Sequence, residues 1–178
     1  EIVEKFKEQA GTATDMSLRA HMLYSAAERL YKNDRANADI HSLLKDAMAA
    51  DPNHHKAARL FERILEDEEN WEALAGLYSS LAEKRPARAE KVLMLLAAAY
   101  TFGHRLDNED AAAGLYAQVL DFHPGHPTAL KFLVKYYESR EDWDHLVAVY
   151  EDTLHGKLKP EDEIAALMQA GMVHWKFR

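Results

Sequence analysis

The stretch His123–Tyr150, HPGHPTALKFLVKYYESREDWDHLVAVY, occurs twice in this chain in related form. The earlier copy, at 51–78, reads DPNHHKAARLFERILEDEENWEALAGLY and aligns with it without a gap, 72 residues upstream. A sequence that repeats at a fixed period indicates stacked copies of one structural unit. The matched positions are Pro52 and Pro124, His54 and His126, Ala57 and Ala129, Glu66 and Glu138, Glu69 and Glu141, Trp71 and Trp143, Leu74 and Leu146, and Tyr78 and Tyr150.

The basic unit is predicted to be a pair of helices. Four prolines, at 52, 86, 124 and 160, are spaced by 34, 38 and 36 residues, which indicates a pair of about 34 residues alternating with a slightly longer one. Gly11 and Gly103 are interpreted as helix stops. No alternating apolar pattern predicts a strand. Apolar spacing predicts helices near 1–10, 16–32, 36–50, 54–67, 70–83, 87–102, 109–122, 127–139 and 142–154, and from 160 onward.

The pattern within the unit is that of a known repeat. Leu93, Leu96, Ala97 and Tyr100 fit its first helix, and Ala112, Tyr116 and Pro124 fit its second. The chain thereby resembles the tetratricopeptide repeat (TPR) family. Trp71 and Trp143, which open second helices, are a local variation of the family's pattern, and their recurrence indicates structural packing.

The resemblance implies an all-α, right-handed superhelical solenoid of antiparallel helix pairs. We expect about four full pairs within a single solenoid segment, 1–178, with partial units at both ends, so the chain is interpreted as a fragment of a longer array. The expected units are 1–11 (end of a preceding unit), 15–52, 53–85, 86–124, 125–157 and 158–178 (first helix of a following unit).

Composition limits the classes of function. The 178 residues carry a net charge of −8, which argues against nucleic-acid binding because phosphate contacts require clustered Lys and Arg. No apolar run approaches the roughly 20 residues of a membrane-spanning helix, so no membrane insertion is expected. The chain has no Cys and therefore no disulfide. We expect a cytoplasmic protein. Because the sequence starts at Glu1 without Met, we also expect that an N-terminal segment of the parent chain is missing.

No motif indicates catalysis, so the chain is predicted not to be an enzyme. It lacks a Gly-rich phosphate loop, a Gly-x-Ser-x-Gly elbow and a His-Glu-x-x-His zinc motif. His54-His55 and His123-x-x-His126 invite a metal hypothesis, but a closed zinc site requires four convergent ligands. Since His54 and His126 recur at the same repeat position, a structural role is favoured. No metal and no cofactor are expected.

The predicted function is protein binding. In the TPR family the first helices line a concave groove, so the resemblance implies that this groove takes a peptide or helix of a partner protein. Basic units alternate there with Met- and aromatic-bearing units, which favours an acidic partner with apolar anchors. The alternative is a structural or self-assembly segment that spaces or oligomerises domains. The predicted groove residues are Tyr24, Tyr31, Lys56, Arg59, Arg63, Lys91, Met94, Phe102, Lys131, Lys135, Met168, Met172 and Trp175.

Overall fold

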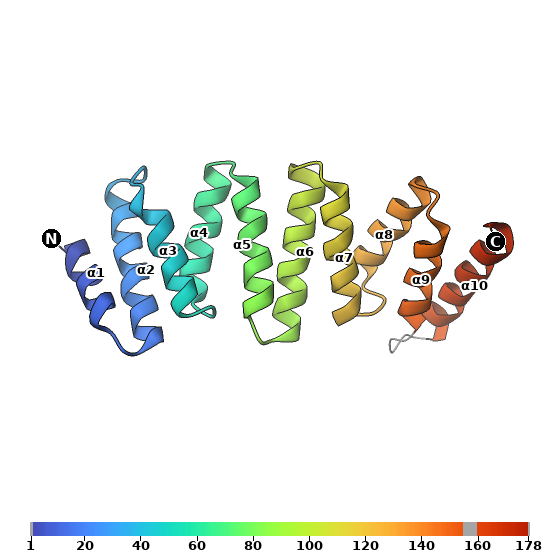
Figure 1. Cartoon of the computed structure of the whole chain (residues 1–178), viewed down its shortest axis with the longest axis horizontal. Helices are drawn as coiled ribbons and strands as arrows, with labels where there is room; N and C mark the ends of the chain where they lie inside the picture. The colour runs from blue at the N-terminus through green and yellow to red at the C-terminus, as the bar shows by residue number, and fades with distance from the viewer. Residues whose placement is uncertain (1, 155–159, 178) are drawn as a thin grey trace. The chain divides into compact units, whose positions relative to one another are not determined.

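The computed structural model of the chain describes residues 2–154 and 160–177. These residues form ten helices and no strand, joined by short turns (Figure 1). Successive helices within each part of the chain run antiparallel to one another. The predicted all-α, TPR-like architecture of helix pairs is therefore confirmed. The handedness of a superhelix along the whole chain stays a prediction.

The chain divides into two compact units, 1–70 and 71–178. The first unit holds α1 (Ile2–Thr12), α2 (Met16–Asn33), α3 (Asp39–Ala50) and α4 (His55–Asp67). Here α2 packs between α1 and α3, and α4 contacts both α2 and α3. Its core is built from large apolar side chains and from alanines at the helix contacts. The fully buried residues of this core include Ala20, Ala26, Ala27, Leu44, Ala47, Ala57 and Leu65.

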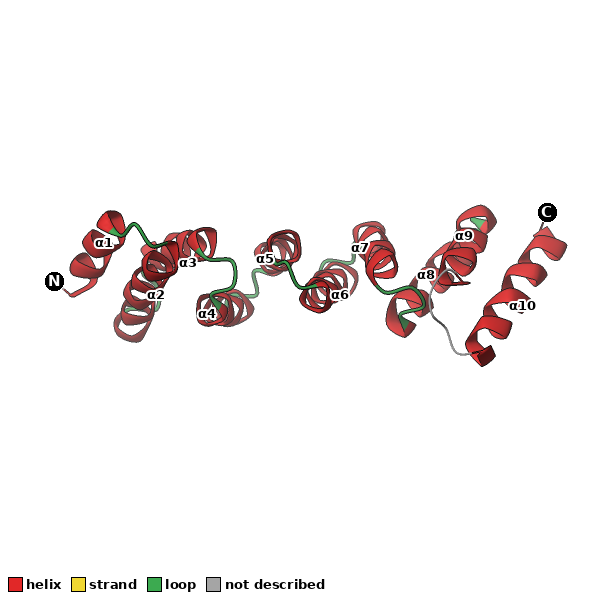
Figure 2. Ribbon diagram, turned by 90° about the horizontal axis from the view of Figure 1, so that it is seen from below, coloured by secondary structure: helices red, strands yellow, loops and turns green. Residues whose placement is uncertain are grey.

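The second unit holds α5 (Trp71–Lys84), α6 (Arg88–Arg105), α7 (Glu109–Phe122), α8 (Pro127–Ser139), α9 (Trp143–Leu154) and α10 (Pro160–Phe177). Within it, α5, α7 and α9 lie in one row and α6, α8 and α10 in the other (Figure 2). One core cluster runs from Ala82 of α5 to Val149 of α9. A second cluster joins α9 to α10 through Leu146, Tyr150 and Val173.

The turns that follow α4 and α8 have the same geometry, 72 residues apart. The backbone N–H of Asn70 donates to the carbonyl of Leu65 at 2.9 Å, and that of Asp142 donates to the carbonyl of Tyr137 at 3.0 Å. These are the six-to-one hydrogen bonds of a Schellman C-cap. The residues before the donors, Glu69 and Glu141, have φ of 53° and 55°. The repeat seen in the sequence is thus a repeat of helix-ending geometry.

Neither predicted glycine stop ends its helix. Gly11 lies inside α1, which continues to Thr12, and Gly103 lies inside α6, which continues to Arg105. A Cβ on Gly103 would lie 3.3 Å from the Cβ of Ala112 and 3.6 Å from the ring of Phe132. Glycine is therefore used at 103 for the close approach of α7 and α8 to α6, and not as a C-cap.

The predicted unit boundaries stay predictions. The pairs expected at 15–52 and 86–124 correspond to α2 with α3 and to α6 with α7. The pair expected at 53–85 comprises α4 and α5, which belong to different compact units. The boundary expected between 157 and 158 lies outside the described residues.

Replacing Glu141 with Gly should stabilise the second unit. A non-glycine residue in the left-handed region costs roughly 1–2 kcal/mol, so Glu141→Gly should raise the free energy of unfolding by about 1 kcal/mol in urea titrations. Gly125 has φ of 74°, and Gly125→Ala should therefore lower it by a similar amount. Glu141→Gln removes the charge but keeps the Cβ, so stabilisation by this variant as well would contradict the backbone explanation.

Candidate functional site

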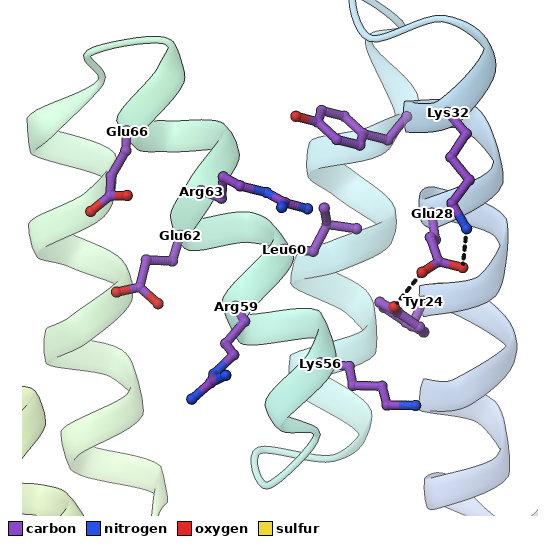
Figure 3. Close-up of a pocket in the computed structure, with 10 residues that line it drawn as sticks. Tyr24, Glu28, Lys32, Lys56, Arg59, Leu60, Glu62, Arg63 and Glu66 are labelled. Carbon is purple, nitrogen blue, oxygen red and sulfur yellow. Dashed lines mark hydrogen bonds and ion pairs between the residues drawn. The ribbon is translucent and has the colours of Figure 1, made fainter.

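A pocket of about 730 Å³ lies between α2 and α4 in the first unit. Five predicted groove residues line it together, namely Tyr24, Tyr31, Lys56, Arg59 and Arg63. Figure 3 shows the pocket with the side chains of Lys56 and Arg63 extending from α4 toward α2, whereas Arg59 points away from α2. The other lining residues are Glu28, Lys32, Leu60, Glu62 and Glu66.

The α2 side of the pocket is an ordered row of three polar side chains one turn apart. The Tyr24 hydroxyl donates to Glu28 Oε1 at 2.7 Å, and Lys32 Nζ lies 3.1 Å from Glu28 Oε2 (Figure 3). The Tyr24 hydrogen bond, followed by that from Lys32, lowers the pKa of Glu28. Burial and the Glu28 carboxylate together raise the pKa of Tyr24 to about 12. The Glu28 charge is thus compensated within α2.

Tyr31, two turns after Tyr24 on α2, is held between two guanidinium groups. The Cζ atom of Arg35 lies 5.1 Å from the ring centroid and that of Arg63 lies 5.9 Å from it. The Tyr31 hydroxyl donates to Asp67 Oδ2 at 3.4 Å. Cation–π contacts of this kind orient both the ring and the guanidinium. The Arg63 side chain is therefore tied to α2 through an aromatic face, which leaves its N–H groups available to an anion.

The cations of α4 are presented by the amphipathic pattern of that helix. Lys56, Arg59 and Arg63 occur at i, i+3 and i+7, which places them on one face. The opposite face buries Ala57, Phe61, Ile64 and Leu65. Among the described residues, Lys56 and Arg59 have no ion-pair partner within 4 Å. Since Glu28 is compensated by Lys32, the pocket has cations available for a ligand's negative charge.

The predicted groove residues of the second unit do not line this pocket. On α6, the Lys91 amine lies 5.7 Å from the Phe122 ring centroid, and Met94 and Phe102 are half-buried against the core cluster. Lys131 and Lys135 are exposed on α8. Met168, Met172 and Trp175 are exposed on α10, with Trp175 at 89%. These predicted groove residues lie on α6, α8 and α10, which form one row of helices (Figure 2), and their place in a groove stays a prediction.

The orientation of α6 differs from the sequence interpretation. Leu93 and Tyr100, which fit the packed first-helix pattern, are 60% and 54% exposed. Ala98 and Thr101, which share a side of α6 with the predicted groove residues Met94 and Phe102, are buried, at 0% and 4% exposed. The reason is the close packing of α7, since Ala112 approaches α6 at Gly103 and so draws the 98–102 side of α6 into the core.

Five residues line the pocket but are not in the groove set predicted from the sequence, namely Glu28, Lys32, Leu60, Glu62 and Glu66. The spacing of Tyr24, Glu28 and Lys32, four residues apart each time, was the available signal for the ordered α2 row. Leu60 is almost fully buried and forms part of the pocket wall only because α2 and α4 stand side by side.

The histidine pairs have structural surroundings. His54 is the N-cap of α4, and its Nδ1 accepts a hydrogen bond from the backbone N–H of Ala57 at 3.1 Å. The His123 and His126 rings lie 5.1 Å apart. Within residues 2–154 and 160–177, no three His, Cys, Asp or Glu side chains are grouped so that they could hold a metal ion. In the same ranges, no helix has the length and apolar character needed to cross a membrane.

No family model matches the sequence, and no curated protein matches it. The solved structures that match the chain include two with low sequence identity. One, described as "MamA AMB-1 C2221", has 15% identity and a TM-score of 0.43, over 86% of this chain and 95% of that one. The other is the TPR domain of P58(IPK), with 15% identity and a TM-score of 0.36. It aligns with 99% of this chain, which spans about half of that domain, 52%. The helical-repeat fold of the chain rests on its own helix pairs and repeated turns.

Stability of the first unit should fall as His54 becomes protonated. Burial, followed by the nearby imidazole of His21, lowers the pKa of His54 in the folded state. The unfolded chain then binds the proton more readily than the folded chain. The free energy of unfolding is therefore highest above pH of about 6.5, and it declines as the pH falls toward the lower pKa that His54 has in the folded state. Protonation also removes the Nδ1 lone pair that caps α4.

The variant His54→Asn keeps an N-cap acceptor but cannot be protonated. It should therefore show a flatter decline of the unfolding free energy between pH 7.5 and 5 than the unaltered chain, measured by urea titration at each pH. His55→Asn, at the neighbouring exposed position, serves as the control. Parallel pH profiles for the unaltered chain and His54→Asn would refute the assignment.

Proposed function

We propose that the chain is a non-catalytic protein-interaction scaffold that binds a peptide or helix of a partner in the groove between α2 and α4. The observation that carries this proposal is that Tyr24, Tyr31, Lys56, Arg59 and Arg63 line one open pocket. A helical repeat presents such a surface on rigid elements, which limits the loss of conformational freedom on binding.

The chemistry of the pocket favours an acidic ligand with an apolar or aromatic anchor. Arg59 and Lys56 supply charges that no described carboxylate within 4 Å compensates. The rings of Tyr24 and Tyr31 and the side chain of Leu60 supply apolar surface between them. Anchors that bury apolar surface contribute most of the affinity at such interfaces, while exposed ion pairs add about 0–1 kcal/mol each. Charge therefore contributes chiefly to selectivity and to the rate of association.

The experiment selects ligands from a random peptide library displayed on phage, with the unaltered chain as bait. Enriched peptides should combine Asp or Glu with a large apolar residue. In fluorescence titrations, the double variant Arg59→Glu/Arg63→Glu should bind these peptides about tenfold more weakly at low salt. The difference should shrink as the salt concentration rises, because salt screens exposed charges.

A matched control reverses two exposed lysines outside the pocket. Lys5→Glu/Lys45→Glu gives the same net charge as the arginine variant and alters α1 and α3 instead. It should leave peptide affinity within about twofold of the unaltered chain. Equal losses in both double variants would show a general charge effect, and no loss in either would refute binding at this pocket.

A second candidate function is self-assembly, and the exposed apolar face of α10 favours it. Contiguous exposed apolar surface of this kind marks interaction sites on folded proteins. The face consists of Ile164, Leu167, Met168, Met172 and Trp175, each at least half exposed.

If this candidate holds, the weight-average mass of the chain should rise with concentration in sedimentation equilibrium. The variant Met168→Gln/Met172→Gln, which keeps helix-forming residues but removes the apolar character, should shift the rise to concentrations about tenfold higher. A mass that stays at the 20.3 kDa of one chain from micromolar to near-millimolar concentration would exclude self-assembly.

A further inference from the structure

Large apolar side chains are exposed in the second unit on two helices. Among the described residues of this unit, every exposed large apolar side chain belongs to α6 or to α10. On α6 they are Leu93 and Tyr100, and Ala97 lies between them at i+4, so the three form one stripe along the helix. No other described helix of this unit covers the α6 stripe or the exposed apolar face of α10.

The α6 stripe ends in a pocket of about 560 Å³ near the start of the helix. Its walls are apolar side chains of α6 together with the turn that joins α7 to α8. The Arg88 guanidinium stands at its edge and is held there by a hydrogen bond from Nε to the Phe122 carbonyl. No acidic side chain lines the pocket. The apolar lining residues are Ala89, Val92, Leu93, Leu96 and Phe122.

Glycine at position 171 of α10 has no explanation within the described chain. Gly171 lies in the interior of α10, where glycine is less favourable than any residue except proline. A Cβ built there would meet no atom within 4 Å. Small residues on an exposed helix face allow the backbone of a second helix to approach closely. The position therefore suits a second helix packed closely on this side of α10.

We infer that α10 of one copy packs antiparallel on the α6 stripe of a second copy, which rests on the self-assembly candidate above. Along α6 the stripe runs Leu93, Ala97, Tyr100, with spacings of four and three residues. Read in reverse along α10, Trp175, Gly171 and Met168 have the same spacings. In this register Trp175 enters the pocket beside Leu93, Gly171 faces Ala97, and Met168 covers Tyr100.

The charges at both ends of this register are complementary. The C-terminal end of α6 carries His104 and Arg105, and α10 begins with an acidic turn that includes the exposed Glu161. Antiparallel packing brings these ends together and also opposes the two helix dipoles favourably. At the other end, the Arg88 guanidinium borders the space that the Trp175 indole would fill, and cations of this kind stabilise an aromatic face.

The length of the exposed stripe favours a helix of a second copy over a small apolar molecule. From Ala89 to Tyr100 the stripe extends about 16 Å along α6, at 1.5 Å per residue. A small molecule in the pocket would leave Tyr100 and the whole α10 face uncovered. Contact between two copies covers the α10 face of one copy and the α6 stripe of the other in one interface.

The first test measures self-association of the 178-residue chain by sedimentation equilibrium. Trp175→Gln and Leu93→Gln each remove one side of the same contact while keeping a helix-forming residue. Each should raise the dissociation constant by roughly thirtyfold, as expected for a buried anchor. The double variant Lys5→Glu/Lys45→Glu, whose changes lie on α1 and α3 of the first unit, should associate like the unaltered chain.

The second test uses two exposed helical glycines with open space around them, Gly171 and Gly114. Both Gly171→Gln and Gly114→Gln should raise the thermal unfolding midpoint by a few degrees, because glutamine is the better helix former. Only Gly171→Gln should weaken association, by about tenfold or more. A variant that is more stable yet associates less cannot be explained by misfolding.

The outcomes separate this inference from the self-assembly candidate itself. If the chain associates and Trp175→Gln weakens it while Leu93→Gln does not, self-assembly stands but the α6 stripe is not the receiving surface. Equal association of Gly171→Gln and Gly114→Gln would overturn the proposed register. A chain that remains monomeric at near-millimolar concentration would overturn both.

Discussion

Close approach of neighbouring helices is the constraint on which each unit depends. The residues with no exposed surface are mostly alanines, and they occur where helices face each other, as with Ala26 and Ala27 on α2 and Ala98 and Ala99 on α6. A small side chain at these points lets the larger side chains beside it interlock. Gly103 takes this furthest, with room for Ala112 and Phe132 only because it has no Cβ.

Helix positions could largely be predicted from the sequence because their signals are local. Pro127 at the first position of α8, Asn108 capping α7 and Asp15 capping α2 each act within one turn of the helix they begin. The 72-residue repeat predicted equivalent turns at 69 and 141, and the structure gives both the same left-handed backbone. Glycine was less informative, since a C-cap and a helix contact both select it and only the packed neighbours distinguish them.

The face that a helix buries was harder to predict than its ends. In α6 apolar residues surround most of the helix, so the pattern of Leu93, Leu96, Ala97 and Tyr100 could be assigned to the packed side although two of the four are exposed. Only the positions of α5 and α7 decide which side is covered. In α4 the separation between the cations and the apolar side is sharp, and Lys56, Arg59 and Arg63 are all exposed. The convergence of Tyr24 and Tyr31 with these cations depends on the placement of α2 beside α4.

The hydrogen-bonded row on α2 has a consequence for the cost of recognition. Tyr24, Glu28 and Lys32 already restrict one another in the free protein, and Tyr31 is clasped by two guanidinium groups. A ligand that enters between α2 and α4 therefore contacts side chains of α2 whose rotamers are already fixed by these contacts. On the α4 side, Lys56 and Arg59 have no such contacts with the described residues and can still change rotamer. The conformational entropy lost on binding therefore comes mainly from the α4 side chains. Its free-energy cost is about 0.5–1.5 kcal/mol for each long side chain that becomes fixed. The ordered α2 side of the pocket can distinguish ligands by shape, while the mobile cations of the α4 side tolerate variation in the position of a ligand's negative charge.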